Sequence, residues 1–193
     1  MLPVKYISVL IFMLAITGCH RAYTPKPAGY LRIDFPEKAY RLFDSAYPYS
    51  FEYPVYAYIV PDTDRFSEPY WVNIDFPRFD GKIHISYKHV RNNLDKYTED
   101  SRTLAYKHTI KADAIKETLY VNDTSRVYGI LYEIKGNAAS SLQFFVTDST
   151  RNFLRGSLYF NVQPNKDSLA PAISFFKDDI VRLMETVRWN NSK

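Results

Sequence analysis

Four short runs of β-branched and aromatic residues follow one another between residues 118 and 162. The runs are TLYVN, RVYGILYEI, SLQFFVTD and FLRGSLYFNV, and the turn-like segments DTS, KGNAAS and STRN stand between them. Connections this short favour antiparallel neighbours, because a parallel crossover needs about a dozen residues or more. This part of the chain therefore predicts an antiparallel meander.

Three further strand signals precede the meander. YWVNIDF and KIHISYK alternate apolar and polar residues, and Asp80-Gly81 between them predicts a hairpin. SFEYPVYAYIV also reads as a strand, although Pro54 argues for an edge or a bulge. One face of that strand would carry Phe51, Tyr53, Val55, Ala57 and Ile59.

Two segments have helical spacing instead. Residues 92–112 predict a helix capped by Asn92 or Asn93, with one stripe formed by Leu94, Tyr97, Ser101, Leu104, Ala105 and His108. KDSLAPAISFFKDDIVRLMETVRW predicts a long amphipathic helix with Ser168 as its cap and Pro171 in its first turn. Its apolar stripe, which we expect to pack on the sheet, comprises Leu169, Ile173, Phe176, Ile180, Leu183 and Val187.

Together these elements predict a single α+β domain, in which helices cover a mainly antiparallel sheet. YSFEYP near the start and the apolar helix at the end resemble the PsbP/Mog1-like domains. That likeness implies a fold and no activity.

The amino-terminal residues indicate export and anchoring. Residues 1–18 have a basic start and an apolar core that is too short to span a bilayer, which is typical of a signal peptide. Ile16, Thr17, Gly18 and Cys19 resemble a bacterial lipobox, so we expect Cys19 to carry a lipid anchor. Cys19 is the only cysteine, which leaves no thiol for a disulfide, a metal or a nucleophile.

The anchor predicts the organisation of the rest of the chain and its membrane partner. Several acyl chains hold a protein on a membrane far more firmly than one chain does. We expect residues 19–49 to form a lipidated, proline-rich tether that docks on the domain, and residues 50–193 to form the globular part. Removal of Lys5 with the signal peptide lowers the formal charge from +4 to +3, and the charges are interspersed, which argues against a nucleic-acid partner.

The candidate chemical groups do not form a reactive pattern. His84, His89 and His108 lack the convergent spacing of metal ligands, so no metal or cofactor is predicted. The carboxylates of DTDRF (62–66) are predicted to be solvated in a loop. Those of KDD (177–179) are predicted to be solvated on the polar side of a helix. Ser140 and Ser141 have no nucleophile-elbow pattern and are read first as part of a turn and second as a partner contact.

Longer blocks resemble one family. YTPKPAGYLRIDFPEKAY, YPYSFEYPVYA, AYKHTIKADAI, GNAASSLQFFVTDSTRNFLRGSLYF and QPNKDSLAPAISFF are similar to the gliding-motility lipoprotein GldD family of the Bacteroidota. The resemblance implies a cell-envelope lipoprotein that supports gliding and type 9 secretion beside other lipoproteins. It supplies no catalytic residue, and Cys19 is the only position that it assigns.

The interpretation is therefore a non-catalytic assembly or scaffold lipoprotein. The alternatives are a PsbP-like module that binds a ligand or a glycan, and an envelope hydrolase. His20 follows Cys19, and HRAYTPK lacks both a retention aspartate and an acidic run. These features favour the periplasmic face of the outer membrane over the outer leaflet of the inner membrane.

Overall fold

Seven strands form the large sheet in the order β3-β4-β5-β9-β8-β7-β6, and every neighbouring pair is antiparallel. The computed structural model describes residues 33–107 and 112–190. The strands are β3 (Tyr58–Pro61), β4 (Val72–Phe76), β5 (Gly81–His89), β6 (Ala112–Asn122), β7 (Val127–Gly136), β8 (Leu142–Thr147) and β9 (Asn152–Phe160). The predicted meander is confirmed, although β6 begins six residues before the TLYVN run.

The hairpin predicted at Asp80-Gly81 joins β4 and β5. Phe76 lies opposite Gly81, and the short 3-10 helix η1 (Pro77–Phe79) connects them. Asp80 has a φ of 46°, a left-handed conformation that Asp adopts more readily than most residues. The apolar side of the two alternating runs is buried from β4 onward, namely Val72, Ile74, Phe76, Ile83, Ile85 and Tyr87. Tyr70, which the same alternation places on this side, is 43% exposed and lies before β4.

A second sheet changes the expected boundary of the domain. It has the order β1-β2-β10, with β1 at Tyr40–Phe43, β2 at Tyr49–Pro54 and β10 at Arg188–Trp189. The boundary expected at residues 49 and 50 therefore falls inside β2, and β1 lies within the predicted tether. The two end residues of β1 are half-buried and the two middle residues are exposed. The sequence of β1 therefore lacks the alternation of apolar and polar residues by which a strand is predicted.

The strand expected across SFEYPVYAYIV is two strands of different sheets. β2 ends at Pro54, and the Ala57 N–H donates to the Pro54 carbonyl oxygen at 3.1 Å, which closes a turn before β3. Val55 is exposed in this turn instead of sharing a face with Phe51. Proline cannot continue the ladder, which explains the break.

Helix α3 (Lys166–Thr186) packs against the large sheet as predicted. Phe176, Ile180, Leu183 and the following Val187 are buried, whereas Leu169 and Ile173 are half-buried. Two local predictions for this helix are wrong. Its cap is Asn165, whose side-chain oxygen accepts from the N–H groups of Asp167 and Ser168, and Pro171 lies in the second turn.

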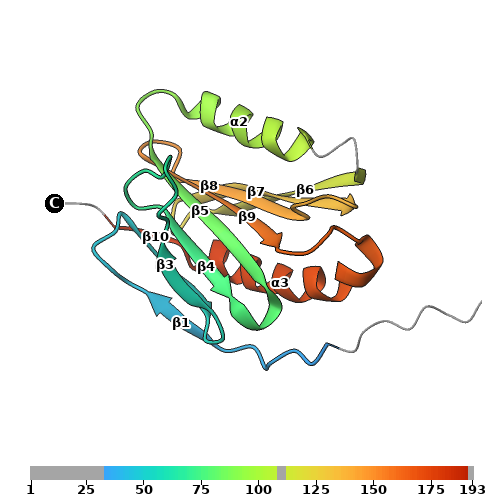
Figure 1. The fold of residues 1–193 in the computed structure, drawn as a ribbon. Coiled ribbons are helices and arrows are strands. Elements are labelled where there is room, and N and C mark those ends of the chain that lie inside the picture. Colours follow the sequence, from blue (N-terminus) through green and yellow to red (C-terminus); the bar gives the residue numbers. More distant parts are fainter. Residues whose placement is uncertain (1–32, 108–111, 191–193) are drawn as a thin grey trace, which may run out of the picture. The chain divides into compact units, whose positions relative to one another are not determined.

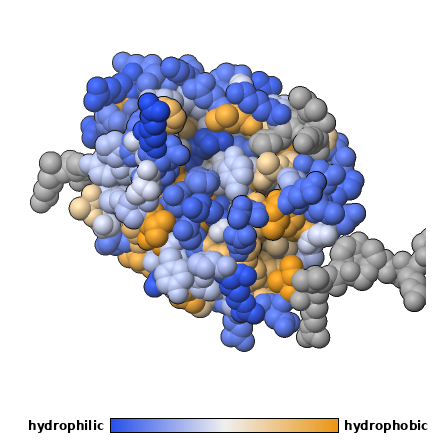
Figure 2. All heavy atoms as spheres, viewed as in Figure 1, coloured by the Kyte–Doolittle hydropathy of each residue, from blue (hydrophilic) through white to orange (hydrophobic). Residues whose placement is uncertain are grey.

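Helix α2 (Leu94–Tyr106) covers the opposite face of the large sheet (Figure 1). Ser101 and Ala105 are buried as expected, but Leu104 is 38% exposed. His108 lies outside the described residues, and the helix ends before it. In Figure 2, hydrophilic residues dominate the visible face, and apolar patches lie between them.

The two faces of the sheet carry separate hydrophobic cores. The larger core joins α3 and β2 to the sheet, and the smaller one lies beneath α2.

Gly156 of β9 faces Phe144 of β8 across the ladder. A Cβ on Gly156 would lie 2.2 Å from Cε1 of the Phe144 ring, so the larger core requires glycine here.

The turn between β8 and β9 is organised by one carboxylate. Asp148 Oδ1 accepts from the N–H groups of Thr150, Arg151 and Asn152 at 2.9, 2.7 and 2.9 Å. Burial tends to raise the pKa of Asp148, but these hydrogen bonds hold it below its ordinary value. Ser149 adopts a φ of 65°, which the ordered turn maintains.

Candidate functional site

The sequence-predicted residues are not brought together into a reactive group. Cys19 and His108 lie outside the described residues. His84 and His89 are both exposed on β5 and, five residues apart, point to opposite faces of that strand. Within residues 33–107 and 112–190, no group of three His, Cys, Asp or Glu side chains could hold a metal ion.

Ser140 and Ser141 are structural residues of the link between β7 and β8. Both are buried, and the Ser140 hydroxyl donates to the Leu142 carbonyl oxygen at 3.4 Å. The Ser141 carbonyl oxygen accepts from the Ile134 N–H at 2.8 Å. These contacts agree with the interpretation as a turn.

The two carboxylate clusters behave differently. Asp62 and Asp64 lie in a loop, where Asp62 Oδ1 accepts from the Asp64 N–H and Asp64 Oδ1 accepts from the Phe66 N–H, each at 3.0 Å. For KDD, the prediction of a solvated face is wrong at Asp179, which is 2% exposed. Its carboxylate is the centre of a buried polar cluster.

This cluster joins α3 to the segment that follows the predicted anchor. Lys38 Nζ donates to Asp179 Oδ1 at 2.7 Å and to the Phe175 carbonyl oxygen at 2.7 Å. The Tyr40 hydroxyl donates to Asp179 Oδ1 at 3.0 Å, and the Tyr56 hydroxyl donates to Asp179 Oδ2 at 2.6 Å. We call Lys38, Tyr40, Tyr56, Phe175 and Asp179 the tether junction.

Aromatic contacts extend the tether junction toward the amino terminus. The Phe35 ring stacks on the Phe175 ring at 4.3 Å between centroids and on the Phe79 ring at 5.7 Å. Lys38 Nζ lies 3.4 Å from the centroid of the Phe175 ring, a cation–π contact. Residues 35–40 are therefore held against α3 by both apolar and ionic contacts.

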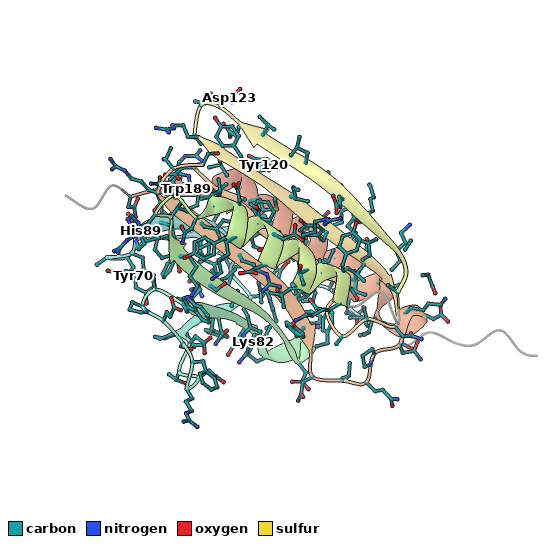
Figure 3. All side chains as sticks on the ribbon, turned by 90° about the horizontal axis from the view of Figure 1, so that it is seen from above. Tyr70, Lys82, His89, Tyr120, Asp123 and Trp189 are labelled. Atoms are coloured by element: carbon teal, nitrogen blue, oxygen red, sulfur yellow. The ribbon has the colours of Figure 1, made fainter. Side chains whose placement is uncertain are left out.

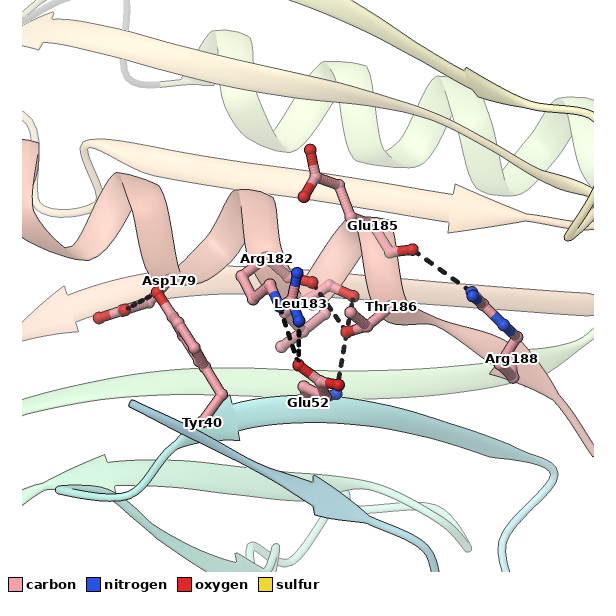
Figure 4. Close-up of polar contacts among 8 residues, drawn as sticks. All are labelled: Tyr40, Glu52, Asp179, Arg182, Leu183, Glu185, Thr186 and Arg188. Carbon is pink, nitrogen blue, oxygen red and sulfur yellow. Dashed lines mark hydrogen bonds and ion pairs between the residues drawn. The ribbon is translucent and has the colours of Figure 1, made fainter. Parts of the chain in front are cut away.

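A second ion pair holds the adjoining strand to the same helix (Figure 4). Arg182 Nη2 and Nε lie 2.7 and 2.8 Å from Glu52 Oε2, and the Thr186 hydroxyl oxygen accepts from the Glu52 N–H at 2.9 Å. The Arg182 guanidinium also lies 5.6 Å from the centroid of the Tyr40 ring. Both β1 and β2 are thus fixed to α3 by polar side chains.

The electrostatics of the tether junction favour a fixed contact over a reactive site. Burial raises the pKa of Tyr40 and of Tyr56, and the Asp179 carboxylate raises both further, so both hydroxyls remain donors at physiological pH. The Asp179 carboxylate accepts three hydrogen bonds from these residues and Lys38. Because Asp179 is also buried, a substrate could reach this carboxylate only if the junction opened.

Sequence reasoning missed the tether junction, although one signal was present. Asp179 lies three residues after Phe176 and four before Leu183, which places it on the buried stripe and not on the polar face. A carboxylate at such a position requires a partner, because an unpaired buried charge is costly. Lys38 carries no comparable signal, because its partner is 141 positions away.

A cleft beside β4 and β5 is the second candidate. A cavity of about 430 Å³ is lined by Asp62, Asp64, Trp71, Asn73, Lys82 and His84 among others, and an adjoining cavity of about 580 Å³ shares Lys82 and His84. We call this the His84 cleft. Figure 3 shows Lys82 beyond the region that α2 covers.

The side chains of the His84 cleft are not saturated. Although His84 is exposed at the surface, partial desolvation of its imidazole by the walls of the cleft lowers its pKa, and the neighbouring Lys82 ammonium lowers it further, so the imidazole is neutral at pH 7. Asn73 Oδ1 is buried without a hydrogen-bond partner among the described residues. The arrangement can bind a polar molecule, but it offers no nucleophile paired with a base.

Comparison with known proteins gives the class and then the family. The protein is a single α+β domain similar to a solution structure of cyanobacterial PsbP (CyanoP) from Synechocystis sp., with a TM-score of 0.50 and 13% identity over 86% of this chain and 100% of that one. This likeness shows the fold alone. The profile of the gliding motility lipoprotein GldD family matches residues 20–189, and the chain belongs to that family.

Two further findings bear on this assignment. No curated protein sequence gives a significant match. In the part of the chain that the structure describes, neither helix is long and apolar enough to cross a bilayer. Family membership makes the chain a motility lipoprotein, a class defined by its role in gliding and not by an enzymatic reaction.

Proposed function

We propose that this protein is a lipid-anchored, non-catalytic assembly component of the gliding and type 9 secretion machinery. The GldD family match supports this proposal, and the tether junction adds a physical role. The junction fixes the segment after the anchor to the long helix of the domain. Residues 35–40 would therefore belong to the rigid body of the domain and not to its connection with the membrane.

The anchor limits how far the domain can act from its membrane. The 14 residue-to-residue steps from Cys19 to Ile33 span at most about 50 Å when fully extended. The tether junction prevents residues 35–40 from lengthening this reach. We therefore propose that the partners lie close to the membrane surface, with the periplasmic face of the outer membrane as the favoured location.

Anchoring is tested by Cys19→Ala in cells fed an acyl analogue. We expect the variant to lose the label and its tight envelope association, because the diacylglyceryl group that carries the acyl chains is attached to this sulfur. Thr24→Ala, a few residues beyond the lipobox, is the matched control and should remain labelled. Labelling that persists in Cys19→Ala would refute the anchor.

A non-catalytic role is tested by His84→Ala and His89→Ala at equal protein level. Each variant should support gliding and secretion like the wild type, because neither histidine lies in a constellation with a nucleophile or metal. A variant that is folded and abundant but inactive would favour an enzyme.

A ligand-binding role is the second candidate, carried by the His84 cleft, in which Trp71, Lys82 and His84 line one cavity. A glycan offers hydroxyl groups for the Lys82 and His84 side chains, and Trp71 offers a ring face for its apolar side. N-acetylglucosamine oligomers should then shift the NMR signal of the Trp71 indole and leave that of Trp189, the second tryptophan, unchanged. Equal shifts at both, or none, would exclude this candidate.

A further inference from the structure

We propose that the outer edge of β6, with which no other described strand pairs, binds an extended segment of a partner protein by β-strand addition. The inference rests on the proposed function, since an assembly component must dock on something, and it names the surface and the chemistry of that docking. β6 is the outermost strand beyond β7, and Figure 3 shows it along the rim of the sheet, with Tyr120 and Asp123 labelled.

The two edges of the large sheet differ in what they offer. β3 has four residues and ends in Pro61, which makes it a poor template for another strand. β6 has 11 residues, a length of about 35 Å, and contains no proline. Its backbone pairs with β7 on one side, so the polar groups of its other side face outward.

The side chains of β6 leave its edge open. Charged residues usually discourage strand addition, and β6 contains Asp113, Lys116 and Glu117. Each has a partner inside the chain: Lys166 Nζ donates to Asp113 Oδ2 at 2.8 Å, Lys116 Nζ lies 3.6 Å from Glu133 Oε1, and Glu117 Oε1 accepts from the Tyr106 hydroxyl at 3.0 Å. The irregularity of the ladder is confined to Ala112–Ala114, so residues 114–122 form a continuous template.

An apolar pair marks the end of this template. The side chains of Leu119 and Val121 are 71% and 55% exposed, and residues two apart on a strand share a face. Ile115 and Glu117 belong to the same face, where Ile115 packs into the smaller core and Glu117 contacts α2. Leu119 and Val121 continue that face without cover, which suits two apolar side chains of an incoming strand.

The same residues argue against a second copy as the occupant. In antiparallel self-pairing, opposite residues share a face, so the two-fold axis passes through one residue. If the axis passes through residue 115, 116 or 117, side chains of like charge lie opposite each other. If the axis passes through Thr118, Glu117 lies opposite Leu119, and if it passes through Leu119, Glu117 lies opposite Val121. An axis at Tyr120 avoids these conflicts but overlaps only the last five residues. The partner is therefore a different protein with apolar residues opposite Leu119 and Val121 and a basic residue opposite Glu117.

The test uses the full lipoprotein in intact cells, with a photo-reactive side chain at the exposed Thr118. Leu119→Lys/Val121→Lys should lower the crosslink to the partner by about tenfold, because edge lysines oppose strand pairing. Leu42→Lys/Val55→Lys adds the same charge at exposed apolar positions of other elements and is the matched control. The melting temperature of both double variants should stay near that of the wild type.

Three results would overturn the proposal: a crosslink to a second copy alone, a crosslink that the β6 lysines leave unchanged, or no crosslink from Thr118. Complementation of a null strain separates this failure from that of the proposed function. If the null strain glides and secretes normally, the proposed function fails. If the null strain is impaired and the β6 lysine variant restores it fully, strand addition alone is refuted.

Discussion

Asp179→Asn tests whether the tether junction stabilises the domain. The substitution keeps the size of the side chain but removes the charge that faces Lys38, whose side chain is 26% exposed. Removing one partner of a buried ion pair typically costs about 3 to 5 kcal/mol. Lys38 keeps its bond to the Phe175 carbonyl oxygen and some contact with water, so the lower end applies.

We therefore expect Asp179→Asn to lower the free energy of unfolding by about 3 kcal/mol, which corresponds to about 6 to 12 °C in melting temperature for a domain of this size. The assay is urea and thermal denaturation of the chain without residues 1–19, followed by circular dichroism. Asp178→Asn is the matched control, because it removes the same charge from an exposed neighbour on α3. Equal effects of the two substitutions would refute the role assigned to Asp179.

A double-mutant cycle isolates the interaction itself. Lys38→Met in the Asp179→Asn background should cost less than it does in the wild type, with a coupling energy of about 1 to 3 kcal/mol. Strict additivity of the two changes would mean that the ion pair contributes nothing and that the loss comes from packing.

Three further outcomes follow from the fold. Phe176→Ala should cost about 3 to 5 kcal/mol of unfolding free energy in urea denaturation, whereas truncation of the 77% exposed Phe66 should cost less than about 0.5 kcal/mol. Asp148 has a lowered pKa, so its contribution is present above the unfolded value of about 4 and is lost as the pH falls through the folded value. Asp148→Asn should flatten this acid dependence of the urea midpoint, and an unchanged profile would contradict the assignment. Gly156→Ala should lower the melting temperature by overpacking, at a cost of about 1 to 3 kcal/mol, and Phe144→Leu in the same chain should restore part of the loss.

Local patterns predicted most of the architecture. Asp80-Gly81 marked its hairpin because the turn needs a left-handed residue, and the spacing of Phe176, Ile180 and Leu183 marked the buried side of α3. Both patterns are local, because the hairpin and the buried side of the helix depend on the backbone geometry of a few neighbouring residues.

Long-range partners explain what sequence reasoning missed. β1 is revealed by its pairing with β2, and Asp179 is buried because Lys38 arrives from the other end of the chain. The edge of β6 became apparent only when the strand order was known, since nothing in its residues says on which side it has a neighbour.

The pairing of β2 with β10 also bears on the timing of export. Arg188 lies opposite Ser50 and Trp189 lies opposite Tyr49, so the second and the last strands of the described fold form one ladder. A chain that crosses a membrane amino terminus first delivers β2 long before β10, and such distant contacts form only once the whole intervening chain is present. The β2–β10 ladder therefore forms only after the last residues have arrived. If the chain is exported and acylated as proposed, Cys19 becomes available for acylation before this ladder exists, and a chain truncated before Arg188 would be anchored without the ladder.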